Sequence, residues 1–190
     1  MIPVFNVSLE RCVFAFFFFS FSGWAGECLM ESIVRKRMVN KGSLRGPYVP
    51  VHGVGGFAIY AALMPLKAHP LLVYIAGVIL CTAVEYLAAL FLEKVVGKRS
   101  WDYATYPFTS WCNFQRRIAL TTSLFFGLAA LAFVYFYWDA TLRLMDIIGL
   151  PALYWLDGAL GLGFTLDIIF TYGACIHNKR AGIPNKTDGL

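Results

Sequence analysis

The sequence predicts an all-α, polytopic membrane protein that forms one integral membrane domain over residues 1–190. Two features of the composition predict this class. Hydrophobic residues make up 59% of the chain and charged residues only 14%, whereas soluble domains average about 45–50% and about 25%. The third observation is that the apolar residues gather in separate long segments, which must be helices because open strands would leave backbone groups unpaired in lipid. The composition excludes a water-soluble globule, a disordered chain and a coiled coil.

About five spans are predicted. Each is roughly 19–27 residues long, enough to cross a hydrocarbon core of about 30 Å. The first is centred on the phenylalanine-rich run at residues 13–19. In chain order, the segments cover residues 11–34, 48–66, 70–96, 117–138 and 151–176.

The segment at residues 48–66 is the weakest helix of the five. It begins with a stretch rich in proline and glycine, which have poor helix propensity. Its firmly apolar part, residues 57–66, is only ten residues long. We therefore keep two interpretations open, a full span and a broken or re-entrant helix whose irregular backbone is covered by protein or water.

Basic residues are distributed unequally between the two sides of this arrangement. One side has three, namely Arg11, Lys67 and Arg143. The other side has thirteen, namely Arg35, Lys36, Arg37, Lys41, Arg45, Lys94, Lys98, Arg99, Arg116, Arg117, Lys179, Arg180 and Lys186. Short cytoplasmic loops carry an excess of Lys and Arg. We therefore expect a protein of the cell membrane, inner or plasma, with its N-terminus outside and its C-terminus in the cytoplasm. The same excess accounts for the net charge of +5 without a nucleic-acid partner.

Carboxylates inside the spans are informative because an ionisable residue at a helix centre costs about 2.5–3.5 kcal/mol on insertion scales. The six are Glu27, Glu31, Glu85, Glu93, Asp157 and Asp167. All except Asp157 fall in the cytoplasmic half of their spans, which predicts an acidic polar site there, with Glu27 and Glu85 facing each other. The alternative is structural: Glu31 and Glu93 form ion pairs at helix ends, and the deeper carboxylates form buried pairs.

Helical spacing supports a shared interior. The stripes are Ser20, Gly23, Glu27 and Glu31 in the first span, Gly77, Cys81, Glu85 and Ala89 in the third, and Arg116, Ser123, Gly127 and Ala130 in the fourth. Small residues on such stripes let helices approach closely. Arg45, Arg116 and Arg117 are the expected counter-charges, and Arg117 is the expected partner of Glu85.

Two loops carry further motifs. In the loop at residues 40–53, the motif Gly46, Pro47, Tyr48, Pro50 and Gly53 fixes a turn. That turn either presents backbone N–H groups to an anion or is only a tight connection into the membrane. The segment at residues 99–111 contains five aromatic residues, which is typical of the membrane–water interface. Single-stranded nucleic acid, the other ligand of such segments, is not expected beside a span.

Metal chemistry is not predicted. The five cysteines and three histidines form no C-x-x-C pair and no cluster with zinc-ligand spacing. We expect small, mostly buried cysteines and no metal site, and the sequence names no cofactor.

An ordered set of short motifs carries a family resemblance. The residues are Gly23-Trp24 with Glu27; Gly42, Gly46-Pro47-Tyr48, Pro50, Gly53 and Gly55; Glu85-Tyr86, Leu92-Glu93, Trp101-Asp102-Tyr103 and Asn113; and Arg117-Ile118, Leu120, Ser123 and Phe126-Gly127. This set, over about residues 20–130, resembles the ABC-transporter type IV permease family of bacteria. The chain departs from the family at Arg116, where the family usually has glycine, and in a longer spacing from Phe108 to Asn113.

The resemblance implies a permease-like transport component. Together with the carboxylates above, it gives the candidate substrate or ion site as Glu27, Glu31, Glu85, Glu93, Asp102, Tyr103, Asn113 and Arg117. Five spans are few for a complete permease, and the sequence contains no Walker-type nucleotide loop. Transport would therefore involve a homo-oligomer or a separate ATPase subunit.

Two other functions stay open. One is a membrane-embedded enzyme acting on lipid or lipid-linked substrates. It would use Glu27, Glu85 or Asp102 for acid–base chemistry and Arg117 as an anion clamp. The other is a structural or regulatory membrane subunit without catalysis.

Overall fold

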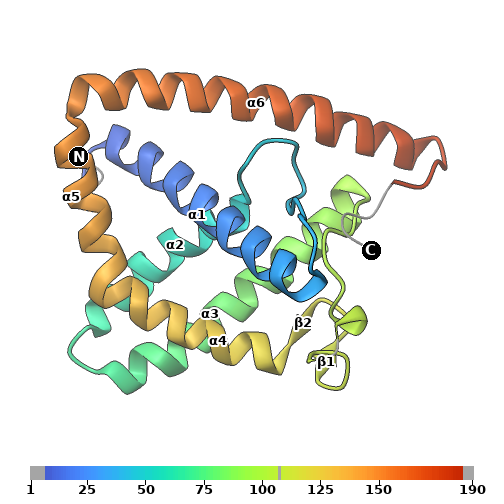
Figure 1. The fold of residues 1–190 in the computed structure, drawn as a ribbon, viewed down its shortest axis with the longest axis horizontal. Helices are drawn as coiled ribbons and strands as arrows, with labels where there is room; N and C mark the ends of the chain where they lie inside the picture. Colours follow the sequence, from blue (N-terminus) through green and yellow to red (C-terminus); the bar gives the residue numbers. More distant parts are fainter. Residues whose placement is uncertain (1–6, 107, 186–190) are drawn as a thin grey trace.

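The computed structural model describes residues 7–106 and 108–185, which form a bundle of helices (Figure 1). The α-helices are α1 (Leu9–Arg35), α2 (Pro50–Leu63), α3 (Pro70–Phe91), α4 (Leu120–Ala132), α5 (Trp138–Ile148) and α6 (Leu150–Arg180). Two short strands, β1 (Asn113–Phe114) and β2 (Ile118–Ala119), pair antiparallel in a hairpin. The predicted helical class is confirmed.

Four helices are long and apolar enough to cross a membrane. They cover Leu9–Arg35, Pro70–Val96, Leu120–Ile148 and Leu150–Arg180 and contain 27, 27, 29 and 31 residues. A shorter apolar helix covers Pro50–Leu66. In the described part of the chain, each of the five predicted segments therefore contains an apolar helix. That the shorter helix spans the membrane or re-enters it stays a prediction.

The glycine-rich start of α2 is helical, although its sequence predicts a poor helix. Pro50 lies in the first turn, where its missing N–H group costs little. Gly53 and Gly56 lie so close to α1 that a Cβ atom on them would collide with Phe16 and Phe19, respectively. Packing against α1 therefore overrides the low helix propensity of this segment.

Small residues also join α3 to α4, as the predicted stripes indicate. A Cβ atom on Gly77 would collide with Ala130, and one on Gly127 would meet the ring of Tyr74. Ser123, Gly127 and Ala130 are the buried residues of α4. The two helices approach as closely as the small-residue rule for membrane helices suggests.

The fourth predicted span has different boundaries in the structure. Residues 118–119 belong to the hairpin, so α4 begins at Leu120 instead of Arg117. After a π-helical turn, Phe133–Tyr137, the helix continues through α5 to Ile148, which makes Arg143 helical where a loop is predicted. The chain changes direction between α4 and α5 (Figure 1), and π-helical turns are a recognised cause of such bends.

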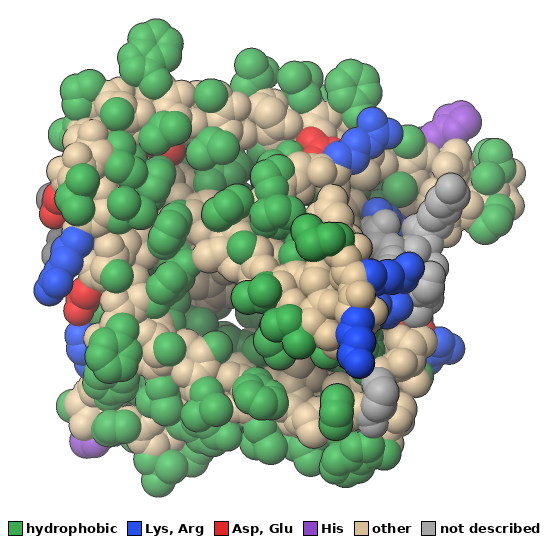
Figure 2. Space-filling model, viewed as in Figure 1, with side chains coloured by type: hydrophobic (Ala, Val, Ile, Leu, Met, Phe, Trp, Pro, Cys, Tyr) green, Lys and Arg blue, Asp and Glu red, His purple; other side chains and the backbone are tan. Residues whose placement is uncertain are grey.

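Polar contacts join separate segments of the chain at the two ends of the bundle. At the end where α1 begins, Arg11 pairs with Asp146 at 2.6 Å. At the end where α1 finishes, the Lys98 ammonium donates to the Ser43 carbonyl at 3.0 Å. Basic side chains gather at the right edge of Figure 2, whereas those at its left edge are accompanied by acidic ones. Lys186, one of the thirteen basic residues, lies outside the described residues.

The last helix, α6, lies along the outside of the bundle (Figure 1). Of its 31 residues, only Leu153 and Thr171 are buried. The ring of Phe164 packs edge-on against Phe16 and Phe17 of α1. The remainder of α6 exposes a large apolar surface, as expected of a helix that faces lipid.

Candidate functional site

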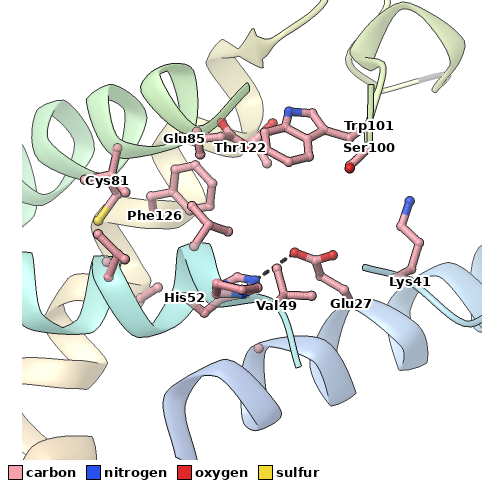
Figure 3. Close-up of a pocket in the computed structure, with 18 of the residues that line it drawn as sticks. Glu27, Lys41, Val49, His52, Cys81, Glu85, Ser100, Trp101, Thr122 and Phe126 are labelled. Carbon is pink, nitrogen blue, oxygen red and sulfur yellow. Dashed lines mark hydrogen bonds and ion pairs between the residues drawn. The ribbon is translucent and has the colours of Figure 1, made fainter. Parts of the chain in front are cut away.

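A large cavity lies between α1, α2, α3 and α4. Its volume is about 1020 Å³, and its wall is mostly apolar and aromatic. It reaches from the loops that follow α1 and α3 to Phe133 and Tyr137, in the π-helical turn between α4 and α5. The charged and ionisable side chains that line it are Glu27, Glu31, Lys41, His52, Cys81, Glu85, Tyr103, Tyr106 and Tyr137. Figure 3 shows several of them around the space.

Glu27 enters the cavity from α1 and is paired with His52 of α2. One Glu27 carboxylate oxygen lies 2.7 Å from His52 Nε2. The pair depends on Gly23, one helical turn earlier in α1, because a Cβ atom there would collide with the His52 ring. Both side chains keep about a third of their surface accessible, 39% for Glu27 and 34% for His52. The pair can therefore contact a ligand in the cavity.

Glu85 enters the same cavity from α3 and is more deeply buried, with only 9% of its surface exposed. Its Oε1 atom accepts a hydrogen bond from the Tyr103 hydroxyl at 2.5 Å. Its Oε2 atom is buried and has no hydrogen-bond partner in the described structure. Burial, together with the Glu85 carboxylate, raises the pKa of Tyr103 well above 10, so this phenol stays a donor at neutral pH.

Glu31 and Lys41 are buried residues of the cavity lining, and Arg35 lies beside them outside the lining. Glu31 pairs with Arg35 one turn further along α1, as the structural alternative predicts for this residue. The Arg35 guanidinium and the Lys41 ammonium both lie over the Tyr106 ring, at 5.9 Å and 5.7 Å from its centroid. Lys41 also donates to the Tyr106 hydroxyl at 3.0 Å. This cluster places the positive charges of Arg35 and Lys41 around Tyr106, and Glu31 is paired within it.

Glu93 and Arg117 lie outside the cavity lining and pair with each other. Arg117 Nε donates to Glu93 at 3.0 Å, and Arg99 contacts the other Glu93 oxygen at 2.8 Å. The expected pair of Arg117 with Glu85 is therefore wrong. Glu93 is two turns further along the same helix, which brings it level with the start of the fourth span, whereas Glu85 lies too deep for Arg117.

Asp102 and Asn113 hold the loop between α3 and α4. Asp102 is 2% exposed, accepts from the Ala104 N–H at 3.0 Å and pairs with Arg116. The hydrogen bond from Arg116 lowers the pKa of the Asp102 carboxyl. Asn113 Oδ1 accepts from the Arg116 N–H at 3.1 Å. Neither residue lines the cavity, so both organise the loop that carries Tyr103.

The aromatic residues of the predicted belt, which lie in the same loop, differ in their surroundings. Phe108 and Trp111 are 74% and 73% exposed, as expected for an interfacial belt. Trp101, Tyr103 and Tyr106 line the cavity, and so does Phe108, whereas Trp111 does not.

The glycine–proline loop does present its N–H groups to an anion, and the anion belongs to the protein itself. Asp167 Oδ2 of α6 accepts from the backbone N–H groups of Arg45 and Gly46, at 2.9 Å and 2.8 Å, and from the Tyr48 hydroxyl at 2.8 Å. Pro47 lies within this turn, and Pro50 both begins α2 and lines the cavity. We call this contact the Asp167 clasp.

Sequence comparison places these features in a family. The model of the family described as "Putative ABC-transporter type IV" matches residues 14–172. The chain belongs to this family. The match runs beyond the predicted residues 20–130 and takes in most of α6, including Asp167. Membership of the type IV transporter family supports a transport-related role of this chain in a membrane. No curated protein and no solved structure matches the chain.

The structure shows the backbone conformation at Arg116, the position where the resemblance implies a glycine. Arg116 has a φ of +64° and follows Gln115 with a φ of +52°, a left-handed conformation that glycine adopts without strain. The turn joins β1 to β2, and the ion pair from Arg116 to Asp102 helps to hold it.

Sequence reasoning does not assign the partners of two residues. Asp167 is a carboxylate within an apolar span, which by itself indicates a buried partner or a function, but the groups that contact it from the loop after α1 are 119 to 122 residues away in the sequence. Nothing in the sequence marks His52 as a site residue, because a single histidine near the end of a span is usually a packing residue without a specific function. Only the fold places it against Glu27.

Proposed function

We propose that this chain is a permease-like membrane transport component and that the acidic cavity is its substrate or ion site. The observation that carries the proposal is Glu85. It projects into a cavity of about 1020 Å³ that Glu27 also lines, and its Oε2 atom has no partner there. Carboxylates at this depth are expensive unless they are paired or used. We also propose the orientation given by the basic loops, with the N-terminus outside and the C-terminus cytoplasmic in the cell membrane.

The contacts favour transport over the enzyme alternative. An enzyme of the kind considered above needs Arg117 as an anion clamp, but Arg117 is held by Glu93 outside the cavity lining. A purely structural subunit gains nothing from a large unfilled space, because protein interiors otherwise pack densely.

We propose further that transport involves a second copy of the chain or a separate ATPase subunit. The sequence contains no Walker-type loop, which is the element that cradles nucleotide phosphates in P-loop ATPases. Light scattering of the purified protein in detergent would report the number of copies.

The test uses two cysteine variants in a background without native cysteines. Gly55→Cys places a thiol in the cavity wall, where a Cβ atom meets no other atom within 4 Å. The matched control is Gly163→Cys, at an equally open position on the exposed surface of α6. A membrane-impermeant cationic methanethiosulfonate should label Gly55→Cys from one face of the membrane and leave Gly163→Cys unlabelled.

The charge of the cavity provides the second arm of this test. The cationic reagent should react with Gly55→Cys faster than an anionic reagent of the same length, because Glu27 and Glu85 attract cations. Changing both carboxylates to glutamine should remove the preference. If Gly55→Cys is as unreactive as Gly163→Cys from both faces, water does not reach the cavity and the transport proposal is wrong.

A further inference from the structure

We propose that the ligand of the cavity is a hydrophobic organic cation, meaning a molecule with one delocalised or poorly hydrated positive charge and a bulky apolar body. This inference rests on the proposed function, because it names the class of substrate for the same cavity. Three properties of the cavity carry it: its shape and apolar wall, its excess of carboxylates, and the aromatic rings beside them.

The cavity has one polar and one apolar region. Glu27 and Phe19 both line it from α1 and are eight residues apart, which corresponds to about 12 Å along a helix. Around Phe19 the wall consists of apolar and aromatic side chains such as Ile59 and Phe133. A small inorganic ion is not stabilised by contact with such a surface, whereas the binding of an apolar body is favourable because it removes apolar surface from water. The volume of about 1020 Å³ lies at the upper end of the range of pockets for drug-sized ligands.

Carboxylates exceed basic groups along the lining. Glu31 is neutralised by Arg35, and Glu27 is paired with His52. Lys41 is a buried basic residue of the lining and donates to Tyr106. Glu85 has only the Tyr103 hydroxyl, and its Oε2 atom, in a side chain that is nine-tenths buried, has no partner in the described structure. A buried acceptor without a partner is costly, and a bound positive charge would relieve that cost.

Aromatic rings line the cavity near Glu85. Trp101 and Phe126 are shown with Glu85 in Figure 3 and line the same space. The Trp101 ring is fixed by a hydrogen bond from its Nε1 to the Arg117 carbonyl at 2.9 Å. Aromatic faces attract cations, most strongly when the cation has little hydration to lose. Carboxylate and aromatic ring together therefore favour a poorly hydrated organic cation over Na⁺ or K⁺.

The experiment compares two ions of the same shape and opposite charge. The purified full-length protein in lipid nanodiscs is titrated with radiolabelled tetraphenylphosphonium and, separately, with tetraphenylborate, and empty nanodiscs are subtracted. We expect saturable binding of the phosphonium and none of the borate. This comparison needs no variant, so a misfolded mutant cannot obscure it. Equal binding of both ions, or no saturable binding of the cation, would overturn the proposal.

A pair of variants locates the binding site. Glu85→Gln should weaken phosphonium binding by about tenfold or more, because glutamine removes the negative charge that attracts the cation and keeps the shape of the side chain. Asp139→Asn removes the same charge from an exposed position at the opposite end of the bundle and should leave the affinity unchanged. Equal affinities of the two variants would contradict the assignment to this cavity.

The binding experiment and the cysteine-labelling experiment can fail independently. If Gly55→Cys is labelled with a preference for cations that depends on the two carboxylates but tetraphenylphosphonium does not bind, the cavity is a transport site for a smaller cation and only the substrate class is wrong. If Gly55→Cys cannot be labelled, both proposals fail together.

Discussion

Replacing Asp167 with alanine should release the loop that follows α1 without unfolding the bundle. In the Asp167 clasp, one carboxylate oxygen of α6 accepts three hydrogen bonds, from the N–H groups of Arg45 and Gly46 and from the Tyr48 hydroxyl. Asp167 Oδ1 in addition accepts from Thr171 at 2.6 Å within α6. The alanine variant loses all three contacts to the loop and keeps the helix, because alanine has the highest helix propensity.

The size of the effect follows from these contacts. A hydrogen bond to a charged group contributes about 1.5–3 kcal/mol, but the contributions are not additive, and the exposed Arg45 region regains bonds to water when it opens. We therefore expect a net loss of about 2–4 kcal/mol in the free energy of loop opening. Since about 1.4 kcal/mol corresponds to a factor of ten, the open population should rise by about 30-fold to about 700-fold.

Limited trypsin digestion in nanodiscs measures this population at the bond after Arg45. Cleavage tracks the open population when opening is faster than cutting. The bond after Arg143, in α5 at the other end of the bundle, serves as the internal reference. Asp139→Ala, which removes an exposed carboxylate paired at 3.6 Å, is the control variant. An unchanged rate at Arg45 in Asp167→Ala would refute the clasp as the contact that holds the loop.

Three further predictions test the remainder of the molecule. An impermeant maleimide applied to intact cells should not label Cys112, because the basic loops place it in the cytoplasm; labelling before permeabilisation would reverse the orientation. Glu93→Gln and Arg117→Gln should destabilise the protein non-additively, because the two side chains form a pair that is 17% exposed on each side, and the cost should be less than that of a fully buried pair, about 3–5 kcal/mol. Glu85→Gln and Arg117→Gln should instead be additive in thermal unfolding; the reverse pattern would contradict the observed pairing. Arg116→Gly should unfold about 2–4 °C above Arg116→Ala, because both lose the ion pair and only alanine keeps the left-handed strain; equal Tm values would show that the turn is not strained.

Much of the helical layout could be predicted because membrane burial leaves strong signals in the sequence. Apolar length gives the spans, and small residues such as Gly77 and Gly127 indicate which helices touch. The failures lie where tertiary contacts override local patterns. The first turns of α2 are helical because Gly53 and Gly56 pack on α1, and α4 begins late because a hairpin absorbs its first residues.

The candidate site was only partly predictable for a related reason. The sequence places Glu27, Glu31 and Glu85 in the cytoplasmic half of their spans, and all three line the cavity. The sequence cannot identify which arginine pairs with each carboxylate. The pairing requires the two residues to lie at the same depth in the membrane to within one helical turn, and the sequence does not give depth so finely. That is why Arg117 pairs with Glu93 although Glu85 was the expected partner.

The cavity itself has no signature in the sequence, and its origin can be traced to how the helices pair. Glycines bring α1 against α2 and α3 against α4 as two close pairs. Such residues fix the separation within each pair but say nothing about the separation between pairs. Phe19 contacts the rings of Phe133 and Tyr137, and the three residues form the apolar wall at one end of the cavity. At the other end, carboxylates and the Tyr103 loop take the place of apolar packing, and polar side chains cannot close a gap as methyl and phenyl groups do. The carboxylates that are costly to bury inside the bundle therefore also keep the cavity open.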